Sequence, residues 1–151
     1  MGSQFSIEKL RENDPTITEV TQFKAPLFGN FATTEEIKQV CEALHNNTHV
    51  VKLDIGIDDD ESLQQLSTLL ANNKVIKQLI LGLGYGITEK SVEFWEQIKK
   101  STTLSELFVT DYNYKYGDNY YILISNALIH NFSITNGYLE VFQICIVIDH
   151  F

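Results

Sequence analysis

The chain has little of what marks secreted or membrane-spanning proteins. It holds two cysteines, Cys41 and Cys145, among 151 residues, which is too few for a disulfide framework. Its apolar runs are shorter than the roughly 18 residues that a spanning helix needs. The N-terminus has no basic flank followed by an apolar core, as a classical secretory signal would. These features predict a cytoplasmic protein without a transmembrane segment.

Positive charge is also scarce, and this shortage limits the partners. Eleven Lys and Arg residues stand against 20 Asp and Glu residues, which gives a formal net charge of −9. Nucleic-acid binding requires basic side chains that neutralise phosphates, and no cluster of them occurs. The same charge disfavours an anionic membrane surface. We therefore expect a protein partner with a basic patch, which the acidic surface would attract during encounter.

One frame of nine residues recurs along the chain and predicts a repeat fold. It is clearest in 47–55 and 73–81, where an asparagine is followed by apolar residues three, six and eight positions later. The first apolar residues of five such frames are Ile17, Val50, Ile76, Leu104 and Ile134, spaced 33, 26, 28 and 30 positions apart. A period near 28 with one strand and one helix per unit is typical of the longer leucine-rich repeats.

Helical patterns follow the predicted strands. Thr33 and Glu36 have the spacing of a capping box, which starts a helix. Four apolar stripes with helical spacing occur: Ile37, Val40, Cys41 and Leu44; Leu63, Leu66, Leu69 and Leu70; Val92, Trp95 and Ile98, with Phe94 beside them; and Tyr121, Ile124, Ala127 and Leu128. Asparagine recurs where these helices end, and because it tolerates left-handed backbone, we predict that it stops them in that conformation.

These patterns predict a single α/β domain over residues 1–151. We expect an N-terminal capping helix in 1–13, repeats in 14–131, and a degenerate last repeat with an irregular C-terminal strand cap in 132–151. Stacking about four to five strand–helix units would give a leucine-rich repeat solenoid, a segment of a right-handed α/β horseshoe.

The chain carries two resemblances to known families. The span from Glu12 to Leu139 resembles the ribonuclease-inhibitor-like leucine-rich repeats, which implies strands inside and helices outside a horseshoe. The residues of 12–20 (Glu-Asn-Asp-Pro-Thr-Ile-Thr-Glu-Val) and of 43–50 (Ala-Leu-His-Asn-Asn-Thr-His-Val) look like the repeat domain of the tropomodulin family. Tropomodulins cap actin filaments, so this resemblance implies an actin-associated cytoskeletal protein as the alternative function.

Motifs that suggest chemistry do not assemble into a site. The glycines of 82–86 lack the spacing of a dinucleotide loop, and we expect them to make a tight turn. The acidic run 58–61 fits a solvated helix start better than a cation site. Cys41 and His45 are four residues apart, but Cys41 lies on an apolar stripe. We therefore predict no catalytic residue, no cofactor and no metal, and a protein that is not an enzyme.

The face of the sheet opposite the helices is the predicted binding site. Strand alternation places there one row of Thr21, Asp54, Ile80, Phe108 and Tyr138, and a second row of Glu19, Lys52, Gln78, Glu106 and Asn136. Five of the seven tyrosines lie nearby in 111–121, and tyrosine is enriched at binding hot spots. We predict that these residues bind a protein partner: Ile80, Phe108, Tyr138, Glu106, Tyr112, Tyr114 and Tyr116. The alternative is that the rings cover the last repeat or are packed by the C-terminal tail.

Two further features of the sequence suggest hypotheses. Residues 1–6 match the short pattern for N-myristoylation at Gly2, although chance or cloning residues explain so short a pattern better, and one acyl chain anchors weakly. The abundance of Ile, Asn and Tyr is compatible with an AT-rich genome, which raises the hypothesis of a host-directed effector of an intracellular pathogen.

Overall fold

The computed structural model describes residues 6–23, 31–111, 118–131, 133–141 and 144–149, and these build one six-stranded sheet. The strands lie side by side in sequence order: β1 (Glu19–Phe23), β2 (Lys52–Asp59), β3 (Gln78–Gly86), β4 (Glu106–Asp111), β5 (Asn136–Val141) and β6 (Ile144–Asp149). β1 to β5 pair in parallel, whereas β6 returns antiparallel to β5. Each unit therefore adds its strand to the edge that the previous unit left.

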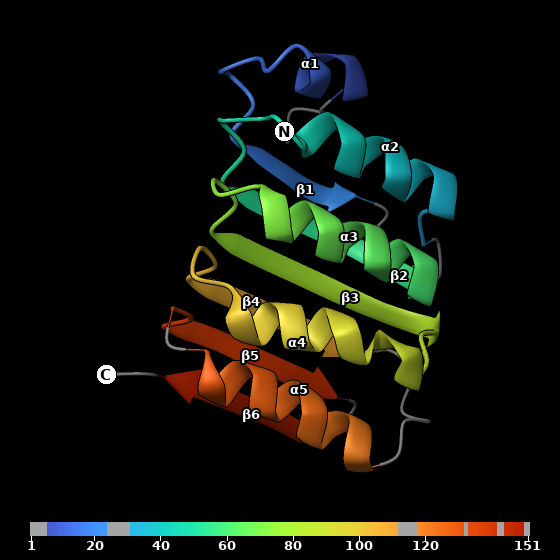
Figure 1. Ribbon diagram of the computed structural model, residues 1–151, viewed down its shortest axis with the longest axis vertical. Coiled ribbons are helices and arrows are strands. Elements are labelled where there is room, and N and C mark those ends of the chain that lie inside the picture. The colour runs from blue at the N-terminus through green and yellow to red at the C-terminus, as the bar shows by residue number, and fades with distance from the viewer. Residues whose placement is uncertain (1–5, 24–30, 112–117, 132, 142–143, 150–151) are drawn as a thin grey trace.

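Helices form a single layer over one face of this sheet (Figure 1). They are α1 (Ile7–Arg11), α2 (Thr34–Leu44), α3 (Asp60–Asn72), α4 (Val92–Lys100), which follows the 3-10 turn η2 (Glu89–Ser91), and α5 (Asp118–His130). α1 lies at the first end of the stack, and the Thr33–Glu36 capping box starts α2. The α/β class, with a parallel sheet and helices, is confirmed.

The core lies between the sheet and the helix layer. Leu53, Leu79 and Leu107 are in register on β2, β3 and β4, and each is fully buried. The third helical stripe was wrong in one position. Val92 is 42% exposed, and Phe94 lies buried beside Trp95 in its place, with the two rings edge to face at 4.9 Å.

Buried asparagines hold the units together, by a mechanism that differs from the predicted one. Asn47, Asn73 and Asn131 each accept hydrogen bonds from main-chain N–H groups two and three residues later in their own unit. Each also donates from Nδ2 to a main-chain oxygen about one unit earlier. Asn73 is extended, with φ −78° and ψ 125°. Among described residues other than glycine, Asn13 alone has a positive φ, so the left-handed prediction was wrong.

The two stretches that resemble tropomodulins bond to each other. Asn13 Nδ2 donates to Thr48 Oγ1 at 2.9 Å, and the Thr48 N–H donates to Asn13 Oδ1 at 2.9 Å. The left-handed backbone of Asn13 (φ 55°) ends α1 and brings its amide to the second unit. This motif therefore attaches the N-terminal cap to the stack.

The glycines of 82–86 do not form the predicted turn, because they continue β3. Asp58 of the preceding strand fills the space beside them, and it accepts a hydrogen bond from the Gly86 N–H at 3.0 Å. A Cβ on Gly84 would collide with this carboxylate, and would lie 2.8 Å from the Phe31 ring. Glycine is required here so that two neighbouring units can approach closely.

Candidate functional site

The strand face is the face of the sheet opposite the helix layer. Asp54, Ile80, Phe108 and Tyr138 are register partners across β2 to β5, and form one of the two predicted rows. Glu19, Lys52, Gln78, Glu106 and Asn136 form the second row. Thr21 leaves the first row, because the register of β1 against β2 shifts between Val20 and Phe23.

Polar side chains of the second row pair with their neighbours. Lys52 Nζ lies 3.5 Å from Glu19 Oε2, and Gln78 Nε2 donates to Glu106 Oε2 at 2.8 Å. Both pairs join adjacent strands, where facing side chains stand about 5 Å apart. Glu106 therefore keeps an ordered carboxylate beside the Ile80–Phe108 pair, a setting suited to one basic group of a partner.

The apolar patch on the strand face is less exposed than predicted. Ile80 and Phe108 are half-buried and are register partners of each other on β3 and β4. Backbone register places Tyr138 next to Phe108. Tyr112, Tyr114 and Tyr116 lie outside the described residues.

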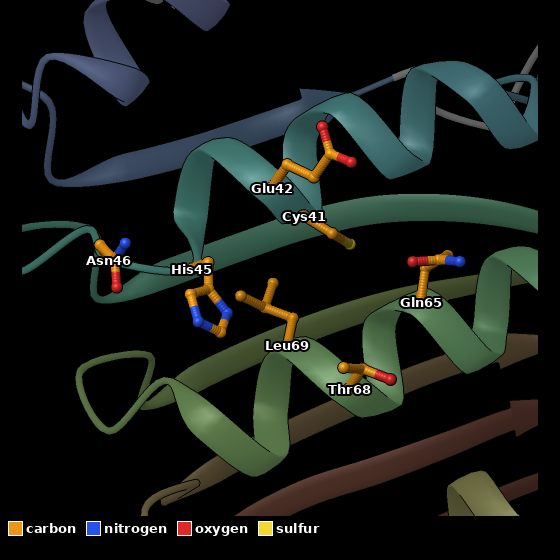
Figure 2. Close-up of a pocket in the computed structure, with 7 residues that line it drawn as sticks. All are labelled: Cys41, Glu42, His45, Asn46, Gln65, Thr68 and Leu69. Carbon is orange, nitrogen blue, oxygen red and sulfur yellow. The ribbon is translucent and has the colours of Figure 1, made fainter.

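A shallow cavity of about 260 Å³ opens on the opposite side of the molecule, between α2 and α3 (Figure 2). Its wall is formed by Cys41, Glu42, His45, Asn46, Gln65, Thr68 and Leu69. These residues combine a few polar groups with apolar surface.

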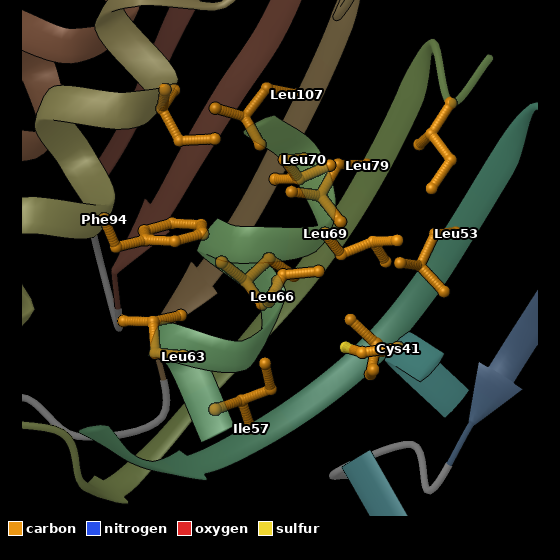
Figure 3. Close-up of a cluster of buried hydrophobic side chains, with 14 of the residues drawn as sticks. Cys41, Leu53, Ile57, Leu63, Leu66, Leu69, Leu70, Leu79, Phe94 and Leu107 are labelled. Carbon is orange, nitrogen blue, oxygen red and sulfur yellow. The ribbon is translucent and has the colours of Figure 1, made fainter. Parts of the chain in front are cut away.

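Cys41 does not supply a nucleophile to this cavity. Its side chain is buried in the core cluster that also contains Leu53, Leu69 and Ile57 (Figure 3). Burial, together with the smaller effect of the neighbouring Glu42 carboxylate, raises the pKa of the Cys41 thiol from 9.0 to about 12. The thiol is therefore protonated at neutral pH and inert, as predicted.

The acidic run at the end of β2 is occupied by protein donors. Asp59 accepts from the Ser62 N–H at 2.7 Å and from Thr34 Oγ1 at 3.2 Å, and so caps α3 and contacts the start of α2. Asp60 accepts from the Thr88 N–H at 2.9 Å. Within the described residues, no group of three or more His, Cys, Asp or Glu side chains could hold a metal ion.

Two exposed isoleucines on α5 were missed by sequence reasoning. Ile122 is 55% exposed and Ile129 is 50% exposed. They are seven residues apart, so they lie on one side of α5, whereas Ile124 and Leu128 face the core. Apolar residues on several sides of this helix were the available signal. None of the helices in the described part of the chain has the length and apolarity to cross a membrane.

Together, the ordered parallel sheet and single helix layer define a leucine-rich-repeat-like fold. The actin-binding site 2 domain of leiomodin-1 is a solved structure similar to this chain, with a TM-score of 0.69 and 25% identity over 91% of this chain and 78% of that one. The tropomodulin C-terminal domain of Caenorhabditis elegans is a second similar structure, with a TM-score of 0.47 and 16% identity over 83% of this chain and 90% of that one. No protein-family profile and no curated protein sequence matches the chain.

Proposed function

We propose that this domain binds actin. The observation that supports the proposal is the similarity to the leiomodin-1 domain, which extends over 91% of the chain at a TM-score of 0.69. The motif at Asn13 supports it further, because the residues that resemble tropomodulins also attach the first cap to the stack. Binding would take place without catalysis, cofactor or metal.

We place the contact on the strand face. Ile80 and Phe108 offer apolar area next to the Glu106 carboxylate, which Gln78 holds at 2.8 Å. An apolar centre with an ordered charge at its rim is the usual arrangement of a protein interface. Backbone register places Tyr138 next to Phe108, so it would extend this contact. We assign Tyr112, Tyr114 and Tyr116, which lie outside the described residues, to the same contact.

Co-sedimentation with actin filaments tests the proposal. The 17.3 kDa chain is expected in the pellet in proportion to filament concentration. Filament elongation should be measured beside it, because a protein that binds only filament ends leaves little material in the pellet. An absence of pelleting, of altered elongation and of binding to actin monomers would reject the proposed function.

Paired variants locate the contact. Ile80→Ala with Phe108→Ala should weaken binding by about tenfold or more if these are hot-spot residues. Val92→Ala is a matched control, since Val92 is 42% exposed on the helix side and should leave binding unchanged. A large fall in melting temperature for the double variant would assign Ile80 and Phe108 to packing instead.

A second candidate is a protein other than actin that carries a basic patch. The net charge of −9 favours it, because complementary charge raises the association rate. Binding to this partner should weaken steeply between low and high salt. The ribonuclease-inhibitor type of horseshoe, a cytoplasmic location and delivery into a host cytosol remain predictions that fit either candidate.

A further inference from the structure

The last unit of the chain is almost free of charge. Residues 119–148 contain one residue of the types Asp, Glu, Lys and Arg, which is Glu140. At the 21% charged residues of the whole chain, about six would be expected over thirty positions. Charged residues are depleted at the centres of protein interfaces, so this composition indicates a surface that is covered.

The helix of this unit presents apolar side chains to solvent. Ile122 and Ile129 are the two most exposed of the large apolar residues among those described, and both lie on α5. α5 is also the last helix of the layer, with α4 on one side of it (Figure 1). Ile129 lies two residues before Asn131, which follows α5. The residue two positions before Ser101, which follows α4, is Lys99, and it is exposed and charged. An apolar residue thus replaces a charged one where the layer ends.

The two edge strands of the sheet, β1 and β6, also differ from each other. β1 forms the first edge, and its register against β2 is interrupted between Val20 and Phe23. Irregular edge strands of this kind resist pairing with another chain. β6 forms the second edge, and all six of its residues pair with β5 in unbroken register. Its sequence, Ile-Cys-Ile-Val-Ile-Asp, has the long, regular and apolar character of a strand that invites pairing.

We propose that a second copy of this chain covers this end of the molecule. Antiparallel pairing of β6 with β6 of the other copy, about a two-fold axis through the sheet, would continue the sheet across the dimer. The same axis keeps both helix layers on one side of the sheet, so α5 of each copy meets α5 of the other. Ile122 and Ile129 then pack against their symmetry mates.

The charge distribution is the reason to choose a second copy as the occupant. Residues 1–73 hold 5 basic and 12 acidic residues, a balance of −7, whereas residues 74–151 hold 6 and 8, a balance of −2. Two like-charged chains meet with the least repulsion through the charge-poor end. A partner with a basic patch would instead be drawn to the acidic first half. The dimer is independent of the proposed actin binding, which uses the strand face.

The molar mass in solution tests this proposal. Light scattering after size-exclusion chromatography should give twice 17.3 kDa at about 0.1 mM protein, a concentration at which a Kd of about 1 µM leaves little monomer. Ile122→Lys with Ile129→Lys should give 17.3 kDa while the circular dichroism spectrum is retained, since both side chains are exposed. Dilution of the wild type should also speed hydrogen exchange of the β6 amides.

A matched variant and two results keep the proposal falsifiable. Val51→Lys alters a residue that is 41% exposed near the first units and should leave the dimer intact. A monomeric wild type at the higher concentration overturns the proposal. If that monomer binds actin and the α5 variant does not, the surface belongs to actin. A dimer that survives the α5 substitutions while its β6 amides exchange freely also overturns it.

Discussion

Asn73 Nδ2 donates a hydrogen bond to the main-chain oxygen of Asn47 at 3.2 Å, so that one repeat asparagine holds the next. The same amide donates to the Leu44 oxygen at 2.8 Å, at the end of α2. Its Oδ1 accepts from the N–H groups of Val75 and Ile76. One buried side chain therefore bonds four main-chain groups in two units. Three of these groups, the Asn47 oxygen and the Val75 and Ile76 N–H groups, belong to the turns that precede β2 and β3.

Substitution of this asparagine should separate its donor role from its acceptor role. Asn73→Ala leaves all four main-chain groups without this partner, and each buried group left unpaired costs about 1–3 kcal/mol. Asn73→Asp keeps the two accepted bonds and loses the two donated ones. We expect both variants to unfold at lower urea concentration, with Ala the lower of the two. Equal midpoints for wild type and Asn73→Asp would contradict a donor role.

The repeat position that is asparagine at Asn47, Asn73 and Asn131 is a serine, Ser101, in the unit of β4. This difference predicts a stabilising substitution. Ser101 accepts long bonds from the Thr103 and Leu104 N–H groups, at 3.4 and 3.3 Å, and its shorter side chain replaces the amide that Asn73 and Asn131 provide. Ser101→Asn should add donation to the oxygens of Leu70 and Asn73, which correspond to Leu44 and Asn47 one unit earlier. We expect about 1 kcal/mol of added stability by urea unfolding.

Ser133→Asn is the control for that substitution, because Ser133 follows an asparagine that is already present at Asn131. Its hydroxyl donates to the Ser101 oxygen at 2.8 Å, so a larger side chain should not stabilise the protein. A gain for Ser133→Asn equal to that of Ser101→Asn would attribute the effect to composition and not to position.

The sequence predicts the stacking of units and the α/β class because these depend on apolar spacing. Leu53, Leu79 and Leu107 fall in register because the repeat sets which residue of each strand faces the helices. The exposed Val92 and Ile122 could not be predicted so well. Apolar residues beside a helical stripe satisfy the same spacing whether they face the core or solvent, and only the neighbouring helix decides between the two.

The role of the repeated asparagines shows a different limit. Their recurrence predicts a shared position, and the sequence alone is compatible with a left-handed stop. The actual role needs an oxygen 26 to 37 residues earlier in the chain, such as that of Leu44 for Asn73. A long-range bond of this kind follows from the three-dimensional stacking and leaves no local pattern.

Asn13 should be sensitive to changes that preserve its backbone. Asn13→Ala removes both bonds with Thr48 and also disfavours φ 55°, whereas Asn13→Gly removes the bonds and permits that backbone. Thermal unfolding should therefore rank wild type above Gly and Gly above Ala, with steps of about 1 kcal/mol. If Asn13→Gly matched the wild type, the bonds to Thr48 would contribute nothing to stability.

Gly84 should not tolerate even one added methyl group. A Cβ there would meet the Asp58 carboxylate and would lie 2.8 Å from the Phe31 ring. Gly84→Ala should lower stability by about 1–3 kcal/mol, as overpacking does elsewhere. Asp58→Ala in the same chain opens the space, so the double variant should recover part of the loss. Additive losses in a double-mutant cycle would show that the two residues do not compete for this space.

The Cys41 thiol gives the prediction that depends on pH. Its folded pKa of about 12 lies above the reference 9.0, so the neutral thiol favours the folded state. This contribution is fully present below pH 9 and is lost as the pH rises from 9 toward 12. With Cys145 replaced by serine, alkylation of the folded protein near pH 8 should run about a thousandfold slower than that of an ordinary thiol, because thiolate is the reacting form.

The unfolded chain supplies the control for that rate. In urea above the unfolding transition, the same variant should react as fast as a free cysteine, since the burial that raises the pKa is gone. Rapid alkylation of the folded protein, at a rate independent of its stability, would mean that the thiol reaches solvent through the cavity between α2 and α3. A slow rate that rises with urea in step with unfolding would show that Cys41 reacts only when the helix layer opens.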